Sequence, residues 1–182
     1  MTHTAISHVV WLGFVGSLLA GLCTALGAAG VFFVRRLSVM LEHSLLSVAA
    51  GIMLAATFFS LLLPAIDYGE TYFGSTSNAV LVAIAGLLSG AVLLHVIHQR
   101  VPHEHFFLGR EGPDGAAFSR IWLFVIAITL HNFPEGTAVG VGFAGGDIAN
   151  GRSLATGIGI QNIPEGLAVS VSLISVGYSR LQ

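Results

Sequence analysis

The sequence predicts an all-α polytopic membrane protein. Only 9% of its 182 residues are charged and 54% are hydrophobic, whereas about a quarter of the residues in ordinary soluble domains carry a charge. The apolar residues also gather in long stretches, and a helix needs about 20 of them to cross the hydrocarbon core of a bilayer. Composition and stretch length therefore point to the same class.

Five apolar stretches of this length follow one another along the chain. We expect five transmembrane helices, and their bounds are approximately 9–34, 44–66, 78–98, 119–146 and 153–177. The connections are short except for the polar loop 99–118, which contains Arg, His and Gly residues. No segment has the composition of a soluble domain, so residues 1–182 are expected to form a single transmembrane domain.

The arginines predict how these helices are oriented, because cytoplasmic loops carry an excess of basic residues. One side of the membrane receives Arg152 together with the acidic Asp67, Glu70 and Asp147. The other side receives Arg35, Arg36, Arg100, Arg110, Arg120 and Arg180. The N-terminus is therefore predicted outside and the 99–118 loop in the cytoplasm.

A polar motif occurs twice within the apolar stretches. Residues 131–136 read HNFPEG in the fourth stretch, and residues 161–166 read QNIPEG in the fifth. Counted from the loop near 147–152 at the α-helical rise, the motifs lie about 21 and 17 Å below the same membrane surface. They are therefore predicted at similar depth, near the bilayer centre, where a carboxylate is costly and usually functional.

The spacing within each motif places its polar side chains together. His131 and Glu135 are four residues apart, as are Gln161 and Glu165, and residues with this spacing share one face of a helix. The two faces would form one pocket if they point at each other.

The prolines add carbonyl oxygens to the same region. Pro134 cannot bond the carbonyl of Leu130, and Pro164 cannot bond that of Ile160. A freed carbonyl in hydrocarbon needs another partner, which a cation or its water would supply. Helices broken in this way near the midplane recur at the ion sites of transporters.

These residue types predict a site for a divalent cation. Two ionised glutamates balance the charge of a dication, and imidazole suits zinc and other late first-row metals. Asn132 and Asn162 add amide oxygens, and Cys23 is the one thiol in the chain. The net charge of −2 argues against a nucleic-acid partner.

Other interpretations of the motifs stay open at this point. A proline in a membrane helix is often only a kink, a buried amide is often a helix–helix hydrogen bond, and the glutamates could be protonated and structural. Two alternative functions are an intramembrane metallohydrolase and a non-metal, proton-coupled carrier. The first would want a general base beside a firmly held metal, and the chain has no His-Glu-x-x-His motif.

In both motifs the chain resembles the Zrt-, Irt-like protein (ZIP) family of divalent-metal transporters, and most of all its bacterial GufA-like branch. Residues 51–67 (GIMLAATFFSLLLPAID) and 101–115 (VPHEHFFLGREGPDG) carry the resemblance as well. The resemblance implies the first five helices of an eight-helix bundle with inverted repeats, so we expect the chain to be the front part of a longer protein.

The resemblance also implies the activity. The expected cargo is chiefly Zn²⁺, with Cd²⁺, iron and manganese as further cations, moved towards the cytoplasm by elevator-like alternating access. The protein would be a transporter and not an enzyme, would need no organic cofactor, and would work as a homodimer in the bacterial inner membrane.

Two metal positions are implied by the same resemblance, with the glutamates bridging them. The first would use His131, Glu135, Gln161 and Glu165, with Met53 nearby. The second would use Asn132, Glu135, Asn162 and Glu165.

Outlying residues are candidates for the entrance and the exit. Asp67 at the external end of the second stretch would attract cations, although an ordinary helix-end carboxylate explains it equally well. Candidates for receiving metal at the cytoplasmic end are His43, His95, His98, His103 and His105. These histidines also fit ordinary solvated residues at the membrane interface.

Overall fold

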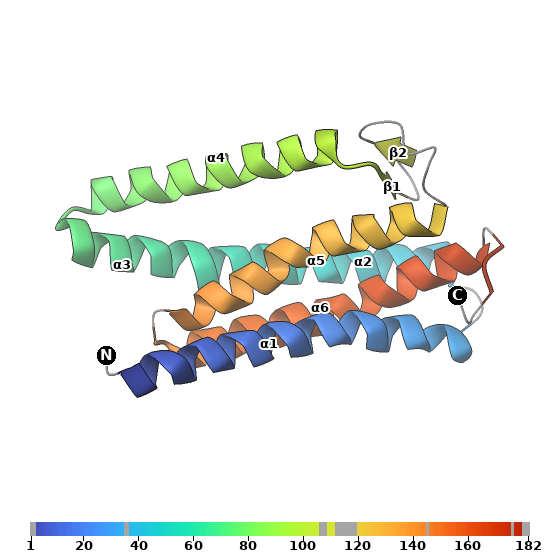
Figure 1. Ribbon diagram of the computed structural model, residues 1–182, viewed down its shortest axis with the longest axis horizontal. Helices are drawn as coiled ribbons and strands as arrows, with labels where there is room; N and C mark the ends of the chain where they lie inside the picture. The colour runs from blue at the N-terminus through green and yellow to red at the C-terminus, as the bar shows by residue number, and fades with distance from the viewer. Residues whose placement is uncertain are drawn as a thin grey trace. The chain divides into compact units, whose positions relative to one another are not determined.

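The computed structural model describes residues 3–34, 37–105, 109–111, 120–144, 146–175 and 177–179. Figure 1 shows its elements along the chain. The helices and strands are α1 His3–Ala29, a 3₁₀ turn Gly30–Phe32, α2 Val39–Ala55, a π-helix Ala56–Leu62, α3 Leu63–Phe73, α4 Thr76–Arg100, β1 His103–His105, β2 Gly109–Glu111, α5 Arg120–Ala144 and α6 Ile148–Ser175.

The predicted fold class is confirmed. Among the described residues, five long helical segments follow one another: α1, the continuous segment formed by α2, the π-helix and α3, then α4, α5 and α6. A two-stranded antiparallel hairpin, β1–β2, occupies part of the 99–118 connection and pairs His103 with Glu111. This hairpin was not predicted, because its strands are three residues long and carry no alternating apolar pattern.

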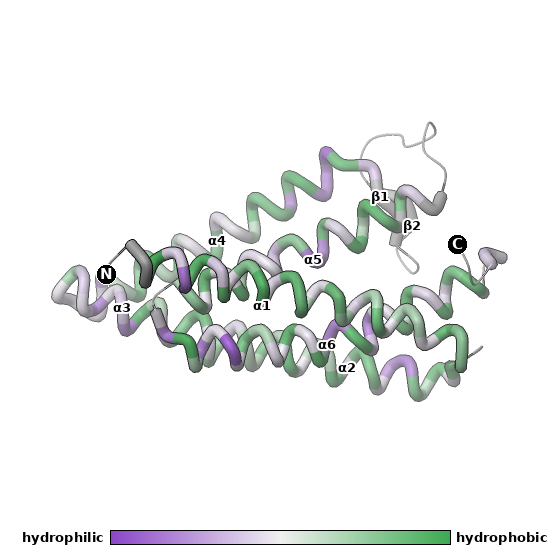
Figure 2. Tube along the Cα trace, turned by 60° about the horizontal axis from the view of Figure 1, so that its bottom comes forward, coloured by the Kyte–Doolittle hydropathy of each residue, from purple (hydrophilic) through white to green (hydrophobic). Residues whose placement is uncertain are grey.

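Three of the helices are long and apolar enough to cross a membrane: Ile6–Phe32, Val39–Phe73 and Thr76–Arg100. The polar motif residues lower the mean hydropathy of α5 and α6, which are not among the three. Large apolar side chains on α4, including Leu81, Leu87, Leu88, Val92 and Leu93, are exposed, and Figure 2 shows hydrophobic colour along most of α4. Such surfaces are too apolar for water and fit a multi-pass membrane protein.

Side-chain caps fix where several helices begin. The Ser38 hydroxyl accepts a hydrogen bond from the Leu41 N–H at 3.2 Å, and the Asp147 carboxylate accepts one from the Asn150 N–H at 2.9 Å. Such caps satisfy N–H groups that have no partner within the helix. A glycine marks the C-terminal end of α3. The helix stops at Gly74, whose φ of 63° is the left-handed conformation that favours glycine.

The π-helix is explained by the proline that follows it. Pro64 has no N–H, so it cannot bond the Ser60 carbonyl as an α-helical residue would. That carbonyl instead accepts a hydrogen bond from Asn150 Nδ2 of α6 at 3.0 Å. Widened turns of this kind inside helices are often found at functional sites, and this one is anchored to a motif-bearing helix.

The chain divides into two compact units. One unit comprises residues 62–134, in which α3 and α4 pack against each other. Their contact is close at Gly69, where an added Cβ would come within 2.9 Å of the Ala79 Cβ. The other unit comprises residues 1–61 and 135–182.

The second of these units contains the core that supports the motifs. Here α6 packs along both α1 and α2, as Figure 1 shows. The buried apolar side chains come from α1, α5 and α6 and are Ala20, Val139, Phe143, Leu154 and Ile158. Three helices therefore meet around one apolar core at this level.

Small residues let these helices approach closely. Cβ atoms built on Gly142 and Gly159 would lie 3.0 Å from Leu154 and 3.3 Å from the Cys23 Sγ respectively. Close packing at small residues is the usual way for helices to associate in lipid. These glycines are therefore packing residues, and Cys23 fills space between α1 and α6.

The predicted orientation is not tested by the fold. Arg35, Arg36 and Arg180, on which that prediction partly depends, lie outside the described residues. The external position of the N-terminus therefore stays a prediction.

Candidate metal centre

Both motifs lie within continuous helices. Pro134 is inside α5 and Pro164 is inside α6, and each helix continues past its proline. The prolines therefore do not break the helices, unlike the broken helices that suggested the comparison with transporter ion sites. Membrane helices tolerate proline because the loss of one backbone hydrogen bond can be compensated locally.

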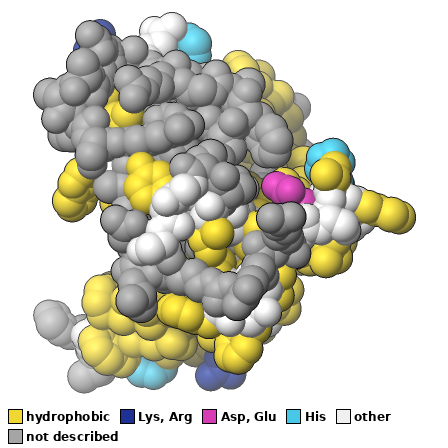
Figure 3. All heavy atoms as spheres, turned by 90° about the vertical axis from the view of Figure 1, so that its right-hand side faces the viewer, with side chains coloured by type: hydrophobic (Ala, Val, Ile, Leu, Met, Phe, Trp, Pro, Cys, Tyr) yellow, Lys and Arg dark blue, Asp and Glu magenta, His cyan; other side chains and the backbone are white. Residues whose placement is uncertain are grey.

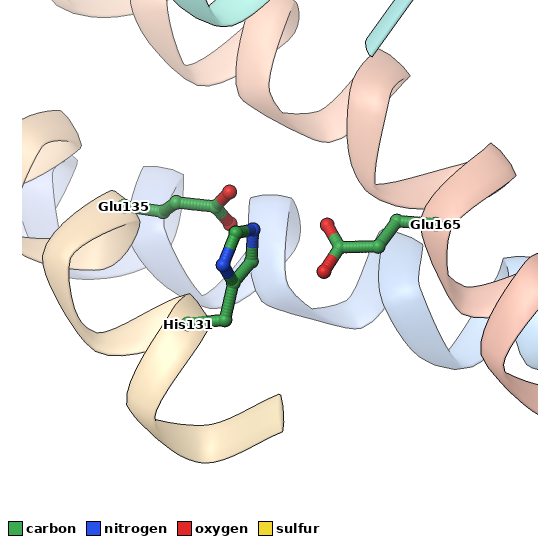
Figure 4. Close-up of side chains that lie close together, drawn as sticks. All are labelled: His131, Glu135 and Glu165. Atoms are coloured by element: carbon green, nitrogen blue, oxygen red, sulfur yellow. The ribbon is translucent and has the colours of Figure 1, made fainter. Parts of the chain in front are cut away.

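The two motifs meet, which their similar predicted depths allow. The Gln161 Nε2 group on α6 donates a hydrogen bond to the Glu135 Oε1 carboxylate oxygen on α5. Ligand atoms of His131, Glu135 and Glu165 all lie within 4.8 Å of one another. Figure 4 shows the two carboxylates pointing toward each other, with the imidazole ring of His131 beside them.

The centre of this arrangement is buried. Glu135 is 6% exposed, and Gln161 and Asn162 are each 1% exposed. Polar groups at this depth are costly unless other groups satisfy them. A carboxylate and two amides therefore need specific partners here, and a cation is the partner that suits a carboxylate best.

One oxygen of the centre is available to accept an interaction. Gln161 Oε1 is buried and receives no hydrogen bond from any described part of the chain. A buried acceptor left in this way calls for an explanation such as an ion or a water molecule. Together with the carboxylates and the imidazole, it gives a donor set that suits a divalent metal.

Helix α1 forms a further wall of the centre, which the sequence analysis did not anticipate. The Ser17 hydroxyl donates to the Gly136 carbonyl at 2.8 Å, and Asn162 Nδ2 donates to the Ala20 carbonyl at 3.0 Å. A Cβ added to Gly27 would overlap the backbone of Ile163. The recurrence of small residues along 9–34 was the one signal that could have suggested close packing of this helix.

Met53 is the member of the predicted ligand set that comes from α2. Helix α2 packs along α6, and the Met53 side chain is 36% exposed. Asn132 follows His131 on α5 and is half-buried. Binding of metal by these two residues stays a prediction.

The histidines near the end of α4 take part in contacts within their own helix. The His98 ring bonds the Leu94 carbonyl at 2.9 Å, and Gln99 lies 3.0 Å from the His95 ring nitrogen. These contacts fit the interpretation as ordinary helix-end residues. They do not test a role in metal release.

The other outlying candidates lie on α2, α3 and β1. Asp67 on α3 and His43 on α2 are exposed, and the backbones of His103 and His105 belong to β1. Among the coloured side chains in Figure 3, hydrophobic groups predominate and histidines are few. Where side chains are described, the one group of three or more metal-ligating residues is His131, Glu135 and Glu165.

Comparison with known proteins gives consistent matches. The chain is 44% identical over 140 residues to zinc transporter ZIPB of Bordetella bronchiseptica, and 43% identical over 149 residues to zinc transporter GufA of Myxococcus xanthus. It is 33% identical over 135 residues to zinc transporter ZupT of Stenotrophomonas maltophilia. No family model matches the chain.

These matches cover most of the chain but only part of each relative. They span 77%, 82% and 71% of the chain, and 45%, 59% and 50% of the respective relatives. The chain therefore spans about half the length of the curated relatives it matches.

Proposed function

Because this chain belongs to the ZIP family, in its bacterial GufA-like branch, we propose that it carries the metal site of a transporter for divalent cations, chiefly Zn²⁺. One observation supports this most strongly. A histidine nitrogen and two carboxylate oxygens from the twin motifs lie within 4.8 Å of one another. Two ionised carboxylates neutralise a dication, and a neutral imidazole adds preference for late first-row metals.

The first metal position uses His131, Glu135, Gln161 and Glu165, with Met53 approaching from α2. Its support is the grouping of three of these residues and the buried Gln161 oxygen. The second position uses Asn132 and the two glutamates, which bridge the metals; family resemblance adds Asn162 to this position.

Transport follows from the mixed donor set. Oxygen and nitrogen ligands without thiolates allow a cation to leave as well as to enter, which passage requires. The cation moves towards the cytoplasm by elevator-like alternating access of the site, in a homodimer in the bacterial inner membrane.

Asp67 attracts cations at the entrance, and metal is received on release by His43, His95, His98, His103 and His105. Cd²⁺, iron and manganese are further cargoes.

Zinc binding by the purified chain in detergent tests the site. His131→Ala, Glu135→Gln and Glu165→Gln are each compared with the unmodified chain by equilibrium dialysis with radioactive zinc. Each variant should bind at least about tenfold more weakly, because losing even an outer partner of a metal ligand commonly costs 10–100-fold in affinity. Competition by Cd²⁺, Fe²⁺ and Mn²⁺ then ranks the cargoes.

Matched substitutions outside the centre provide the control. His8→Ala on α1 and Glu70→Gln on α3 remove the same chemical groups from exposed positions and should leave zinc binding unchanged. Equal binding by the unmodified chain and the three site variants would refute the proposed centre. Zinc-dependent peptide cleavage would favour an intramembrane metallohydrolase instead.

Uptake into proteoliposomes tests transport separately from binding. The unmodified protein should take up zinc, and Glu135→Gln should abolish uptake. Binding without uptake would leave the site in place but contradict the transporter. Solute movement driven by a pH gradient with no effect of zinc would favour the non-metal carrier.

A further inference from the structure

The amide of Asn162 can be oriented in only one way. One end of it faces the Ala20 carbonyl of α1 at 3.0 Å. A backbone carbonyl oxygen only accepts hydrogen bonds, so the Asn162 atom facing it must be the NH₂ group. The Asn162 Oδ1 oxygen therefore points away from α1.

That orientation determines the next amide. Asn162 Oδ1 lies 2.9 Å from the terminal nitrogen of Gln161, and an oxygen there requires Gln161 to present its own NH₂ group. The same NH₂ group also donates to the Glu135 carboxylate. Both hydrogens of Gln161 Nε2 are thus committed, one to Asn162 and one to Glu135.

The remaining atom of the Gln161 amide is its oxygen. Gln161 Oε1 is buried and accepts no hydrogen bond from the described residues. Turned by 180°, the amide would set its oxygen against two acceptors, Asn162 Oδ1 and the Glu135 carboxylate, and would leave its NH₂ group in place of this oxygen. The carbonyl of Ala20, a backbone atom of α1, thereby decides that an oxygen is offered.

We propose that Asn162 is a positioning residue. It donates a hydrogen bond to the Ala20 carbonyl, accepts one from the Gln161 NH₂ group, and so holds the Gln161 amide with its oxygen toward the metal. This inference rests on the proposed function, since it concerns how the same centre binds its cargo. It differs from the ligand role that family resemblance implies for Asn162. Both polar atoms of Asn162 are already engaged, at 2.9 and 3.0 Å.

A double-mutant cycle on zinc binding distinguishes the two roles. Asn162→Leu removes both hydrogen bonds with little change in volume. It should weaken zinc binding by about tenfold or more, as is usual when a residue that hydrogen-bonds a metal ligand is lost. In the Gln161→Glu background the same substitution should cost less than about twofold, because a carboxylate presents an oxygen in either orientation.

The opposite pattern would overturn the inference. If Asn162 were itself a ligand, its loss would weaken binding equally in both backgrounds. His131→Ala and Glu165→Gln are measured alongside, so that failure of the whole centre is recognised by unchanged binding in those variants. Asn78→Leu on α4, where the asparagine is exposed, is the matched control and should bind zinc normally.

Two additions keep the test decisive if Asn162→Leu folds poorly. Asn162→Ala leaves space for water beside the Ala20 carbonyl and is taken through the same cycle. Infrared spectroscopy of the unmodified chain supplies a readout without any change at position 162. Zinc should shift one buried amide carbonyl band that Gln161→Glu removes, and the absence of such a shift would overturn the proposal.

Discussion

Gly166 of α6 lies directly against the backbone of Thr24 of α1. A Cβ built on Gly166 would overlap the Thr24 carbonyl, and one built on Gly27 would overlap the backbone of Ile163. Two glycines, one from each helix, therefore allow α1 and α6 to touch backbone to backbone beside the second motif. The position of Glu165, next to Gly166, depends on this contact.

Gly166→Ala should therefore destabilise the protein. The added methyl group must push α1 and α6 apart, and overpacking of this kind costs about 1–3 kcal/mol. Thermal unfolding in detergent should show a lower midpoint for Gly166→Ala and for Gly27→Ala. Gly21→Ala on α1 is the control, because a Cβ there meets nothing within 4 Å; a similar loss at Gly21 would contradict the close contact.

Zinc should raise the thermal stability of the unmodified chain. A ligand that binds only the folded state stabilises it by about 2.7 kcal/mol at one hundred times its dissociation constant. Glu165→Gln should lose most of this gain, because one of the two carboxylates that face each other is removed. Mg²⁺ at the same concentration should have little effect, since it prefers an octahedron of oxygens and keeps its waters.

Asn150→Leu should loosen the contact between α6 and the π-helix. The substitution leaves the Ser60 carbonyl without the side-chain donor that it has at 3.0 Å, and hydrogen bonds between membrane helices contribute about 0.6 kcal/mol on average and at most about 1.7. The midpoint of thermal unfolding should fall by a correspondingly small amount. Zinc affinity should stay within about twofold, because Asn150 lies in the first turn of α6, about 16 Å along the helix from Gln161.

Ser17→Ala tests the support that α1 gives to the first motif. The Ser17 hydroxyl donates to the Gly136 carbonyl at 2.8 Å, so its removal should cost about 0.5–1.5 kcal/mol of stability. Zinc binding should weaken only modestly, since Glu135 keeps its contact with Gln161. Ser89→Ala is the comparison, because Ser89 bonds the Gly86 carbonyl of its own helix at an exposed position. Equal stability of the Ser17 and Ser89 variants would argue against a supporting role for α1.

The prolines show how far sequence reasoning reached. It placed Pro134 and Pro164 correctly within long helices, because apolar runs continue on both sides of each motif, but it compared them with broken helices, whereas α5 and α6 are continuous. It did not anticipate the π-helix Ala56–Leu62 before Pro64. The missing hydrogen bond follows from the residue type, but the group that compensates for it, Asn150, comes from a helix 90 residues away.

The sequence by itself determined the all-helical class, the five long helices and the polar face of each motif. These features depend on local quantities: apolar length, helical spacing and the intrinsic chemistry of His131, Glu135 and Glu165. Only the tertiary structure decided that the two motif faces point at each other, that α1 closes the centre, and that Asn162 orients Gln161. Outside the motifs the faces of these helices are all apolar, so periodicity does not reveal which face meets which neighbour. That choice is made by close contacts between small residues such as Gly27 and Gly166, whose recurrence indicates close packing but not the partner.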